Sequence, residues 1–478
     1  MTALPKEALR RGWCPSTLRP METGDGWLVR LHPPGAQLTP PQLRRIAALA
    51  AEHGNGLVEI SARANLQIRG VTPASHPMLV ERLLAERLVD EHEGDGPQRL
   101  TLVSPLAGAC RHSGASRSEE PGIHEHSRDR RSAGDSSAPT IGDEVQGLQA
   151  LGVAAPRNDG QGLIDAAALS AAIEERVRSI AGLPAKHCVI VDDGGRQALD
   201  GFACDIRLVA VESGRVVVGL ADTIWRGPVS ELDAPAIVET VLRGFARARS
   251  AAPERIRRLR DLSAAALSGL GGLAETAAPA PRPAPRRAGL FALAGDRFAA
   301  LVNLPFGRCD AATLDRLGAG VGTQQADIRF SPWRGLAFRN LSHVDAEAML
   351  ALANNLGLIT RDDDPRLSVQ ACAGSPACSR AEAPAMADAA KLAEAASDLL
   401  AQGATLHVSG CIKSCAHPAA ADLTLVGRDG RYDVVLGGTA RDKPLATLDL
   451  STLMARLQPG EEIHARLTNA ARITGPRG

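Results

Sequence analysis

The alternation of apolar and polar residues predicts two similar groups of elements, one towards each end of the chain. In the first group residues 26–34 read as a strand, residues 40–53 as a helix and residues 57–71 as a second strand. The same order of strand, helix and strand returns in residues 298–307, 311–317 and 326–341. In both groups the second strand has a basic, polar segment inside an apolar run and is followed by a helix. We interpret the two groups as a degenerate internal duplication.

A second pattern, an Ala-rich helix followed by short apolar strands, also occurs twice. The strands of the first copy are residues 186–195, 202–211 and 215–221. Those of the second copy are residues 405–410, 421–427 and 432–438. Only the second copy carries paired cysteines, so we expect that one half kept a cofactor and the other became scaffold.

Two stretches lack these patterns and read as linkers. Residues 111–142 contain almost no apolar side chain, which predicts a disordered insertion. Residues 276–287 include the run Pro-Ala-Pro-Arg-Pro-Ala-Pro-Arg-Arg, which favours a semi-rigid, extended spacer. The expected domains are a first ferredoxin-like half-domain (1–110), an α/β domain without a cluster (143–275), a second half-domain (288–365) and a cluster domain (366–478).

Composition and charge exclude several classes of protein. Lys plus Arg and Asp plus Glu both number 54, so no net charge favours nucleic acid or an anionic membrane. The chain has no apolar run of membrane-spanning length and no signal-peptide core at its start, so we expect a cytoplasmic protein. Nine cysteines are an odd number for a disulfide framework and suit metal binding in a reducing compartment better.

Four of the cysteines form two pairs. Cys372 and Cys378 have five residues between them, including Gly374 and Pro376, and Cys411 and Cys415 have three. Four thiolates suit an iron-sulfur cluster or zinc. Structural zinc usually prefers a gap of two residues, so the spacing favours a 4Fe-4S cluster, with zinc and four buried structural cysteines as the alternatives.

These cysteines, together with the Arg-x-Asn-x-Gln-x-Arg segment at residues 63–69 and the duplicated architecture, resemble the sulfite and nitrite reductase superfamily. The resemblance implies an α+β fold with two ferredoxin-like half-domains and two α/β domains. It also implies that the four cysteines hold the cluster, and that Cys415 stands where the reductases bridge to sirohaem. Residues 407–418, Cys14-Pro15 and residues 23–26 are more similar to the precorrin-3B synthases of aerobic cobalamin biosynthesis.

The closer resemblance implies a monooxygenase that uses dioxygen to hydroxylate precorrin-3A at C20 and closes a lactone from the ring A acetate. Electrons would come from NADH or a ferredoxin-type reductase, because the sequence contains no Gly-x-Gly-x-x-Gly between a strand and a helix. A non-haem iron is a further possible cofactor. The alternatives are a sirohaem-dependent sulfite or nitrite reductase and a carrier or redox sensor that uses the cluster alone.

A precorrin carries many carboxylates, which guanidinium groups hold well. If residues 63–69 form a strand, the side chains of Arg63, Asn65, Gln67 and Arg69 share one face. Arg63 matches a tetrapyrrole ligand of the superfamily, and Arg99 and Lys186 match two other basic positions. Arg329 and Arg334 in the duplicated segment are weaker candidates, and for any one arginine a solvated surface charge is the ordinary alternative.

Two departures from the reductases favour the synthase: Leu100 replaces an Asn and Cys188 replaces a Lys. His417 could be a hydrogen-bond donor behind the cluster or an iron ligand, although a cap of a turn is as plausible. Asp192 and Asp193 precede two glycines, which favours a tight turn over a metal or proton site. The remaining cysteines are expected to be structural: Cys14, Cys110, Cys188, Cys204 and Cys309.

Overall fold

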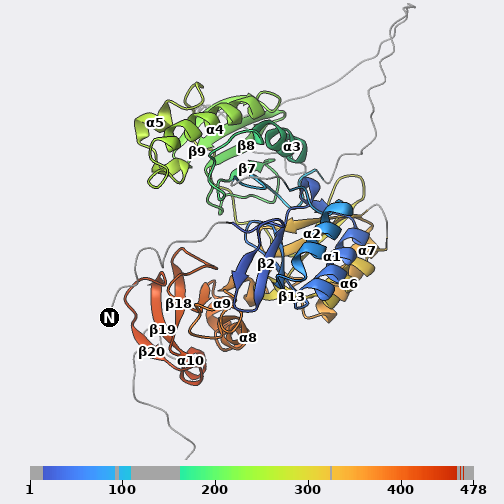
Figure 1. The fold of residues 1–478 in the computed structure, drawn as a ribbon, viewed down its shortest axis with the longest axis vertical. Helices are drawn as coiled ribbons and strands as arrows, with labels where there is room; N and C mark the ends of the chain where they lie inside the picture. Colours follow the sequence, from blue (N-terminus) through green and yellow to red (C-terminus); the bar gives the residue numbers. More distant parts are fainter. Residues whose placement is uncertain are drawn as a thin grey trace, which may run out of the picture.

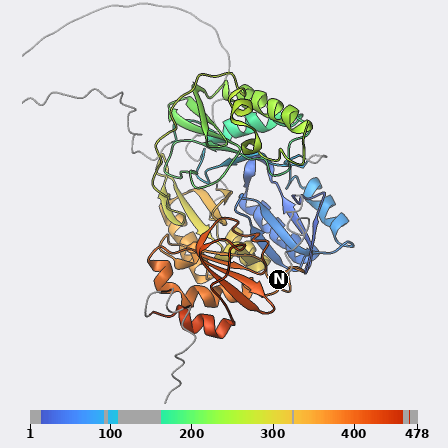
Figure 2. The same cartoon turned by 90° about the vertical axis from the view of Figure 1, so that its left-hand side faces the viewer.

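The computed structural model describes residues 14–91, 96–108, 162–322 and 326–459, together with Ile463 and Leu467. Cys110 and the linker predicted at residues 111–142 lie outside these residues. The described residues contain four five-stranded sheets. Two of them lie at the centre of the molecule, and the other two belong to α/β domains at opposite ends (Figures 1 and 2).

The first half-domain packs helices α1 and α2 against one sheet. Thr39 begins α1 with a capping box, in which its hydroxyl accepts from the Gln42 amide and the Gln42 side chain accepts from the Thr39 amide. The elements in chain order are β1 (Met21–Thr23), β2 (Gly26–Leu31), the 3-10 turn η1 (Pro34–Ala36), β3 (Gln37–Leu38), α1 (Pro40–His53), β4 (Leu57–Ile60), β5 (Leu66–Val71) and α2 (His76–Ala85).

The second half-domain repeats this order. Asp310 takes the place of the Thr39 cap, because its carboxylate accepts from the Thr313 amide at the start of α6. The elements are β11 (Gly289–Ala292), β12 (Phe298–Asn303), the 3-10 turn η3 (Pro305–Gly307), β13 (Arg308–Asp310), α6 (Ala311–Ala319), β14 (Asp327–Ser331), β15 (Gly335–Leu341) and α7 (His343–Asn355). The internal duplication predicted for these two groups is confirmed.

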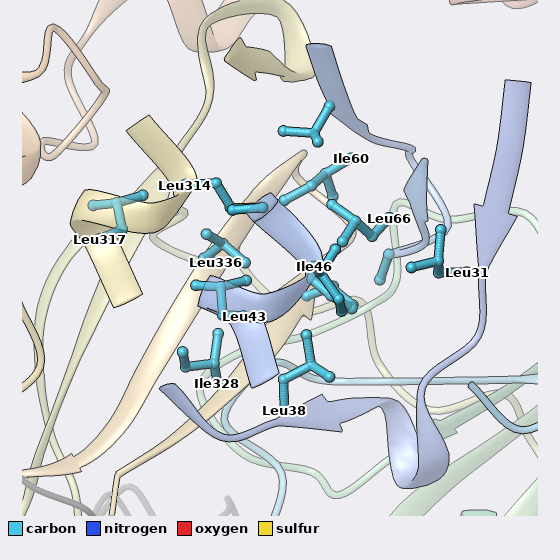
Figure 3. Packing of buried hydrophobic residues seen from close by; sticks show 14 of the residues in the cluster. Leu31, Leu38, Leu43, Ile46, Ile60, Leu66, Leu314, Leu317, Ile328 and Leu336 are labelled. Carbon is cyan, nitrogen blue, oxygen red and sulfur yellow. The ribbon is translucent and has the colours of Figure 1, made fainter. Parts of the chain in front are cut away.

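The half-domains exchange one strand each. Strand β3 of the first pairs with β14 of the second, and β13 of the second pairs with β4 of the first. Helices α1 and α6 lie against each other over one shared core. Figure 3 shows Leu43 and Ile46 of α1 pointing into the same core as Leu314 and Leu317 of α6. The exchange and the common core join the halves into one unit.

The two α/β domains have the same sheet topology. In each sheet the first three strands are parallel neighbours, and two antiparallel strands complete one side. The first domain contains β6 (Thr101–Val103), α3 (Ala166–Val177), β7 (Val189–Asp192), β8 (Ile206–Glu212), β9 (Arg215–Leu220), β10 (Ile224–Ser230), α4 (Ala234–Ser250), the 3-10 turn η2 (Leu259–Asp261) and α5 (Ala264–Ser268). The duplication predicted for the Ala-rich blocks is also confirmed.

The second α/β domain carries the four paired cysteines. Its elements are the 3-10 turn η4 (Pro365–Ser368), β16 (Val369–Ala371), α8 (Ala385–Ala395), α9 (Ser397–Ala401), β17 (Leu406–Ser409), β18 (Ala421–Arg428), β19 (Arg431–Gly438), β20 (Ala446–Leu448) and α10 (Leu450–Leu457). The first half-domain was expected to end at residue 110. Strand β6 lies before that residue but pairs with β7, so it belongs to the sheet of the first α/β domain.

The Pro-rich segment is fixed to the first α/β domain. Arg282 donates to the carboxylates of Asp192 and Asp200, and the side-chain amide of Gln197 donates to the carbonyl oxygen of Arg286. The turn predicted at Asp192 is confirmed, because this carboxylate also accepts from the Gly194 amide at 2.9 Å.

Candidate functional site

The four cysteines lie in the loops that follow two neighbouring parallel strands. Cys372 directly follows β16, and Cys411 comes two residues after β17. Since Ala371 is in register with Val408, the two loops leave the same edge of the sheet. Gly374 and Gly410 let these loops touch, because a Cβ added to Gly410 would lie 3.1 Å from the Cα of Gly374. The two cysteine pairs, far apart in the sequence, are therefore neighbours.

The four thiols form one electrostatic group. Burial raises the pKa of Cys372, and the thiols of Cys415 and Cys378 raise it further. Burial also raises the pKa of Cys411, with contributions from all three other thiols. The Gly410 amide donates to the Cys372 sulfur at 3.0 Å, a contact that would stabilise a thiolate. Among the described residues, no three His, Cys, Asp or Glu side chains converge on a site for a single metal ion.

The loop between Cys372 and Cys378 is tied to the first half-domain. The Gly24 amide and the Arg69 guanidinium both donate to the Ala377 carbonyl oxygen, at 3.1 and 2.9 Å. A Cβ at Gly24 would lie 2.2 Å from the Pro376 carbonyl oxygen, so only glycine fits there. The Thr23–Gly26 turn, which the sequence left open as a simple loop, therefore supports the cysteine loop.

Arg69 is committed to structural partners. It is only 2% exposed, and it donates to both carboxylate oxygens of Asp25, at 2.6 and 2.9 Å, and to Glu59 at 3.3 Å. Neither cavity described below is lined by Arg69. Its position at the domain boundary identifies it as a positioning residue for the cysteine loop.

The prediction of a single strand carrying Arg63, Asn65, Gln67 and Arg69 is wrong. Strand β5 begins at Leu66, and Arg63 and Asn65 lie in the turn that joins it to β4. This turn is closed by the Ser61 amide, which donates to the Asn65 carbonyl oxygen at 3.0 Å, and Ala64 adopts a left-handed φ of 52°. The antiparallel pairing of β4 with β5 requires such a reversal.

Arg63, Asn65 and Arg99 line a cavity of about 160 Å³. Other residues that line it are Cys14, Arg19, Arg30 and His32. Arg63 donates to the main-chain oxygen of Lys186 at 2.9 Å, so Lys186 contributes through its backbone. Burial lowers the pKa of Arg30, although its contact with Cys14 acts in the opposite direction. The cavity is strongly basic and suits an anionic ligand.

Gln67 on β5 links Arg30 and Glu59 in a hydrogen-bonded network on the sheet of the first half-domain. Its carbonyl oxygen accepts from Arg30 at 2.7 and 3.0 Å, and its amide donates to Glu59 at 3.2 Å. Glu59 also accepts from Arg308 of β13, at 2.5 and 3.0 Å. At the equivalent positions of the second half-domain, Leu301 and Ala337 replace Arg30 and Gln67, and both are buried in an apolar cluster. At these two positions the first half-domain is polar and the second is apolar.

Arg329 and Arg334 lie apart, although only four residues separate them in the sequence. Arg329 lines a second cavity of about 250 Å³, together with Arg63 and Arg99. Arg334 lies beside the second cysteine loop, because it donates to the Ala416 carbonyl oxygen at 3.2 Å and to the Gln370 side chain at 3.0 Å. Burial lowers the pKa of Arg334.

Two histidines accompany the last cysteine. The ring of His407 on β17 is fully buried and 5.6 Å from the ring of His417. Burial lowers the pKa of His407 to about 4, with His417 and Arg334 adding to the effect. The His417 ring lies 3.3 Å from the Ala420 carbonyl oxygen, which fits the cap of a turn.

Sequence reasoning missed several residues of this region: Arg30, His32, Glu59 and Arg308. Arg30 interrupts an apolar strand, and that irregularity was the one available signal. Glu59 and Arg308 are 249 residues apart and meet only through the exchange of β13, which no local pattern reports.

Comparison with known proteins identifies the family. Residues 19–86 match the model of the nitrite/sulfite reductase ferredoxin-like half domain. The structure of the NirA protein of Mycobacterium tuberculosis aligns with a TM-score of 0.63 at 20% identity, covering 93% of this chain and 84% of that one. This likeness confirms the expected α+β, reductase-like fold.

Two sequence relatives differ in how much they cover. The sulfite reductase [NADPH] hemoprotein beta-component of Methylocella silvestris is 29% identical, over 27% of this chain and 24% of its own length. A protein of Sinorhizobium sp named precorrin-3B synthase is 31% identical, over 98% of this chain and 94% of its own length. The chain therefore belongs to the precorrin-3B synthase family, within the sulfite and nitrite reductase superfamily.

Proposed function

We propose that this protein is a precorrin-3B synthase, a monooxygenase that hydroxylates precorrin-3A at C20 and closes a lactone from the ring A acetate. The observation that carries the proposal is the match to the Sinorhizobium protein, which extends over nearly the whole of both chains. One atom of dioxygen enters the product, and the other is reduced to water by two electrons and two protons. The electrons come from NADH or a ferredoxin-type reductase.

The cofactor of the proposal is a 4Fe-4S cluster held by Cys372, Cys378, Cys411 and Cys415. The donor set fits this group, because the four thiols lie in adjacent loops and an amide already points at the Cys372 sulfur. A bound cluster supplies one-electron transfer. Free thiols at the eight described cysteines are consistent with a reducing compartment, and we place the protein in the cytoplasm. None of the described helices has the length and apolarity of a membrane span.

The chain's own residues bind and orient the tetrapyrrole. Arg30, Arg63 and Arg99 offer guanidinium groups to its peripheral carboxylates, and Asn65 adds an amide on the same cavity wall. Arg329 extends this wall into the larger cavity. Gln67 and Arg69 hold the supporting network in place, with Lys186 fixing Arg63 through its carbonyl oxygen. Arg334 donates to Ala416 in the Cys415 loop, where it would hold the substrate edge near the cluster.

Anaerobic purification followed by turnover under labelled dioxygen tests the function. We expect iron and sulfide in a ratio near one, and one labelled oxygen atom in the product formed from precorrin-3A. A product without label would exclude the monooxygenase proposal. A reductase of sulfite or nitrite is the competing function, although the sulfite reductase component of Methylocella silvestris matches only 27% of this chain. That enzyme would purify with stoichiometric sirohaem and its intense Soret band.

A further inference from the structure

The larger cavity lies where three parts of the chain meet. Its walls come from the η1 turn of the first half-domain, from Arg329 and Phe330 on β14 of the second, and from β6 and α3 of the first α/β domain. Four residues line both this cavity and the smaller one, so the two adjoin: His32, Arg63, Gln98 and Arg99.

One difference between the duplicated halves lies at the wall of this cavity. Strand register makes Gln37 equivalent to Arg308, and two residues earlier Gly35 is equivalent to Phe306. Both residues have a left-handed φ, 60° for Gly35 and 55° for Phe306. The Phe306 ring fills the core of the second α/β domain. A Cβ at Gly35 would meet no atom nearer than Gln37 Cγ at 3.9 Å, so the corresponding space stays open.

Among the described residues, Arg329 at the cavity wall lacks the ion-pair partner that Glu59 has at the equivalent position of the first half-domain. Glu59 on β4 and Arg329 on β14 occupy equivalent positions in the two sheets. Glu59 faces Arg308 across the exchanged strand and forms an ion pair of 2.5 Å with it. Arg329 instead faces the neutral Gln37, to which its Nη2 donates at 3.1 Å. The second half-domain thus presents a guanidinium where a carboxylate partner is missing.

Two arginines of this wall have unmet hydrogen-bonding capacity. Arg329 is only 4% exposed, and its Nε and Nη1 are buried without a hydrogen-bond partner. Nη1 of Arg99 is in the same condition, and its Nη2 donates to the Pro33 carbonyl oxygen. Burial, then the charge of Arg339, lowers the pKa of Arg329 to about 9. Unpaired buried charge is destabilising, and a carboxylate would relieve it.

The acidic residues of the cavity wall have other partners. One carboxylate oxygen of Glu174 accepts from the amides of Leu100 and Thr101 and from the Thr101 hydroxyl, at 2.7 to 2.8 Å. Asp90 pairs with Arg178 at 2.8 Å, and Glu175 acts on the same Arg178. Asp327 pairs with Arg339 on the far side of Arg329. The charges of Glu174, Asp90 and Glu91 act on Arg99, and that of Asp327 acts on Arg329, yet Nη1 of Arg99 and Nε and Nη1 of Arg329 still have no hydrogen-bond acceptor among the described residues.

We propose that this cavity is a carboxylate-binding subsite, in which a ligand carboxylate takes the place beside Arg329 and Arg99 that Glu59 takes beside Arg308. The carboxylate has two possible sources with the same chemistry. One is a peripheral acid chain of precorrin-3A that passes the shared wall of Arg63 and Arg99, and this source rests on the proposed function. The other is a small free acid.

Thermal unfolding of the purified holoenzyme in acetate tests the subsite without substrate. At constant ionic strength, acetate should raise the Tm of the wild type saturably relative to chloride. Arg329→Gln should weaken the apparent acetate affinity at least fivefold. Arg316→Gln is the matched control, because it removes an exposed arginine of α6 in the same half-domain and should behave as the wild type.

A second pair of variants tests the cavity itself. Gly35→Phe should fill it, as Phe306 does in the other half, and abolish the acetate effect. Gly35→Ala carries the same backbone constraint without filling the space, so it should retain the effect. If acetate stabilises the wild type, a Gly35→Phe protein that it stabilises equally would overturn the proposal.

Binding of precorrin-3A under anaerobic conditions separates the two sources. If acetate has no specific effect but Arg329→Gln and Gly35→Phe each weaken precorrin-3A at least tenfold, the subsite holds a substrate carboxylate. If acetate acts through Arg329 and precorrin-3A does not bind, the subsite stands and the proposed function fails. If neither ligand distinguishes Arg329→Gln from Arg316→Gln, the subsite does not exist.

Discussion

The guanidinium of Arg69 donates a hydrogen bond of 2.9 Å to the carbonyl oxygen of Ala377, inside the loop between Cys372 and Cys378. The second half-domain makes an equivalent bond to the other α/β domain. Arg339, the counterpart of Arg69 on β15, donates at 2.6 Å to Ala107, in the loop after β6 of the first α/β domain. Each half-domain therefore holds one α/β domain, and among the described residues only the bond from Arg69 acts on a loop that carries cysteines.

This relationship predicts different results for two matched variants. Arg69→Gln breaks a buried ion pair with Asp25 and Glu59, which costs about 3–5 kcal/mol, and also releases the cysteine loop. Arg339→Gln breaks the equivalent pair with Asp327. Both should lower the Tm, but only Arg69→Gln should lower iron and sulfide content. Equal iron loss in both variants would show that the bond from Arg69 is merely structural.

The cysteine assignment predicts a sharp contrast. Cys378→Ser should abolish the cluster and the activity, because a serine hydroxyl is a poor soft-metal ligand. Cys309→Ser on β13 should keep both, since Cys309 packs against the shared core of the half-domains and is not part of the cysteine loops. Iron analysis and the visible spectrum measure the difference. Loss of iron from the Cys309→Ser protein would contradict the ligand set.

The smaller cavity predicts a binding defect without a cofactor defect. Arg99→Gln removes a charged hydrogen-bond donor from the wall, and such a bond contributes about 1.5–3 kcal/mol. Precorrin-3A affinity should fall by about 10- to 100-fold, with iron content unchanged. Arg44→Gln, which breaks only the exposed pair with Asp315, is the control and should bind like the wild type.

His187 predicts a specific dependence of stability on pH. The ring is fully buried against Phe245, its nitrogens have no hydrogen-bond partner among the described residues, and Nδ1 lies 3.7 Å from a carboxylate oxygen of Asp205. Burial lowers the pKa of His187 from 6.5 to about 4, although the charge of Asp205 acts in the opposite direction. The unfolded chain therefore binds this proton below pH 6.5, whereas the folded protein binds it only below about pH 4. The free energy of unfolding should fall by up to about 3 kcal/mol as the pH decreases from 6.5 to 4.

Chemical denaturation at several pH values measures this effect. His187→Leu should flatten the decline between pH 6.5 and 4, because the replacement cannot take up a proton. His343→Leu removes a half-exposed histidine at the start of α7 and should keep the wild-type slope. An unchanged slope in His187→Leu would mean that another group causes the acid sensitivity.

The repeated order of strands and helices was readable from the sequence, because periodicity is local. The helix predicted at residues 40–53 has those bounds. The helix predicted at residues 311–317 begins where expected and ends two residues later, at Ala319. The cysteine spacing was also readable, since thiol chemistry and loop-forming residues are properties of the sequence itself. These local signals were sufficient to identify the superfamily and its expected cofactor.

The roles of the arginines were decided by tertiary structure alone. Four arginines or amides that the sequence placed on one strand are divided between a turn and a strand, because Ala64 reverses the chain. Arg69 meets Ala377 across 308 residues, and Arg329 lacks an acid because an exchanged strand brings Gln37 to it. The sequence around an arginine does not show its role. Whether its guanidinium holds a loop in place or is available to a ligand depends on the charged groups that distant segments bring next to it.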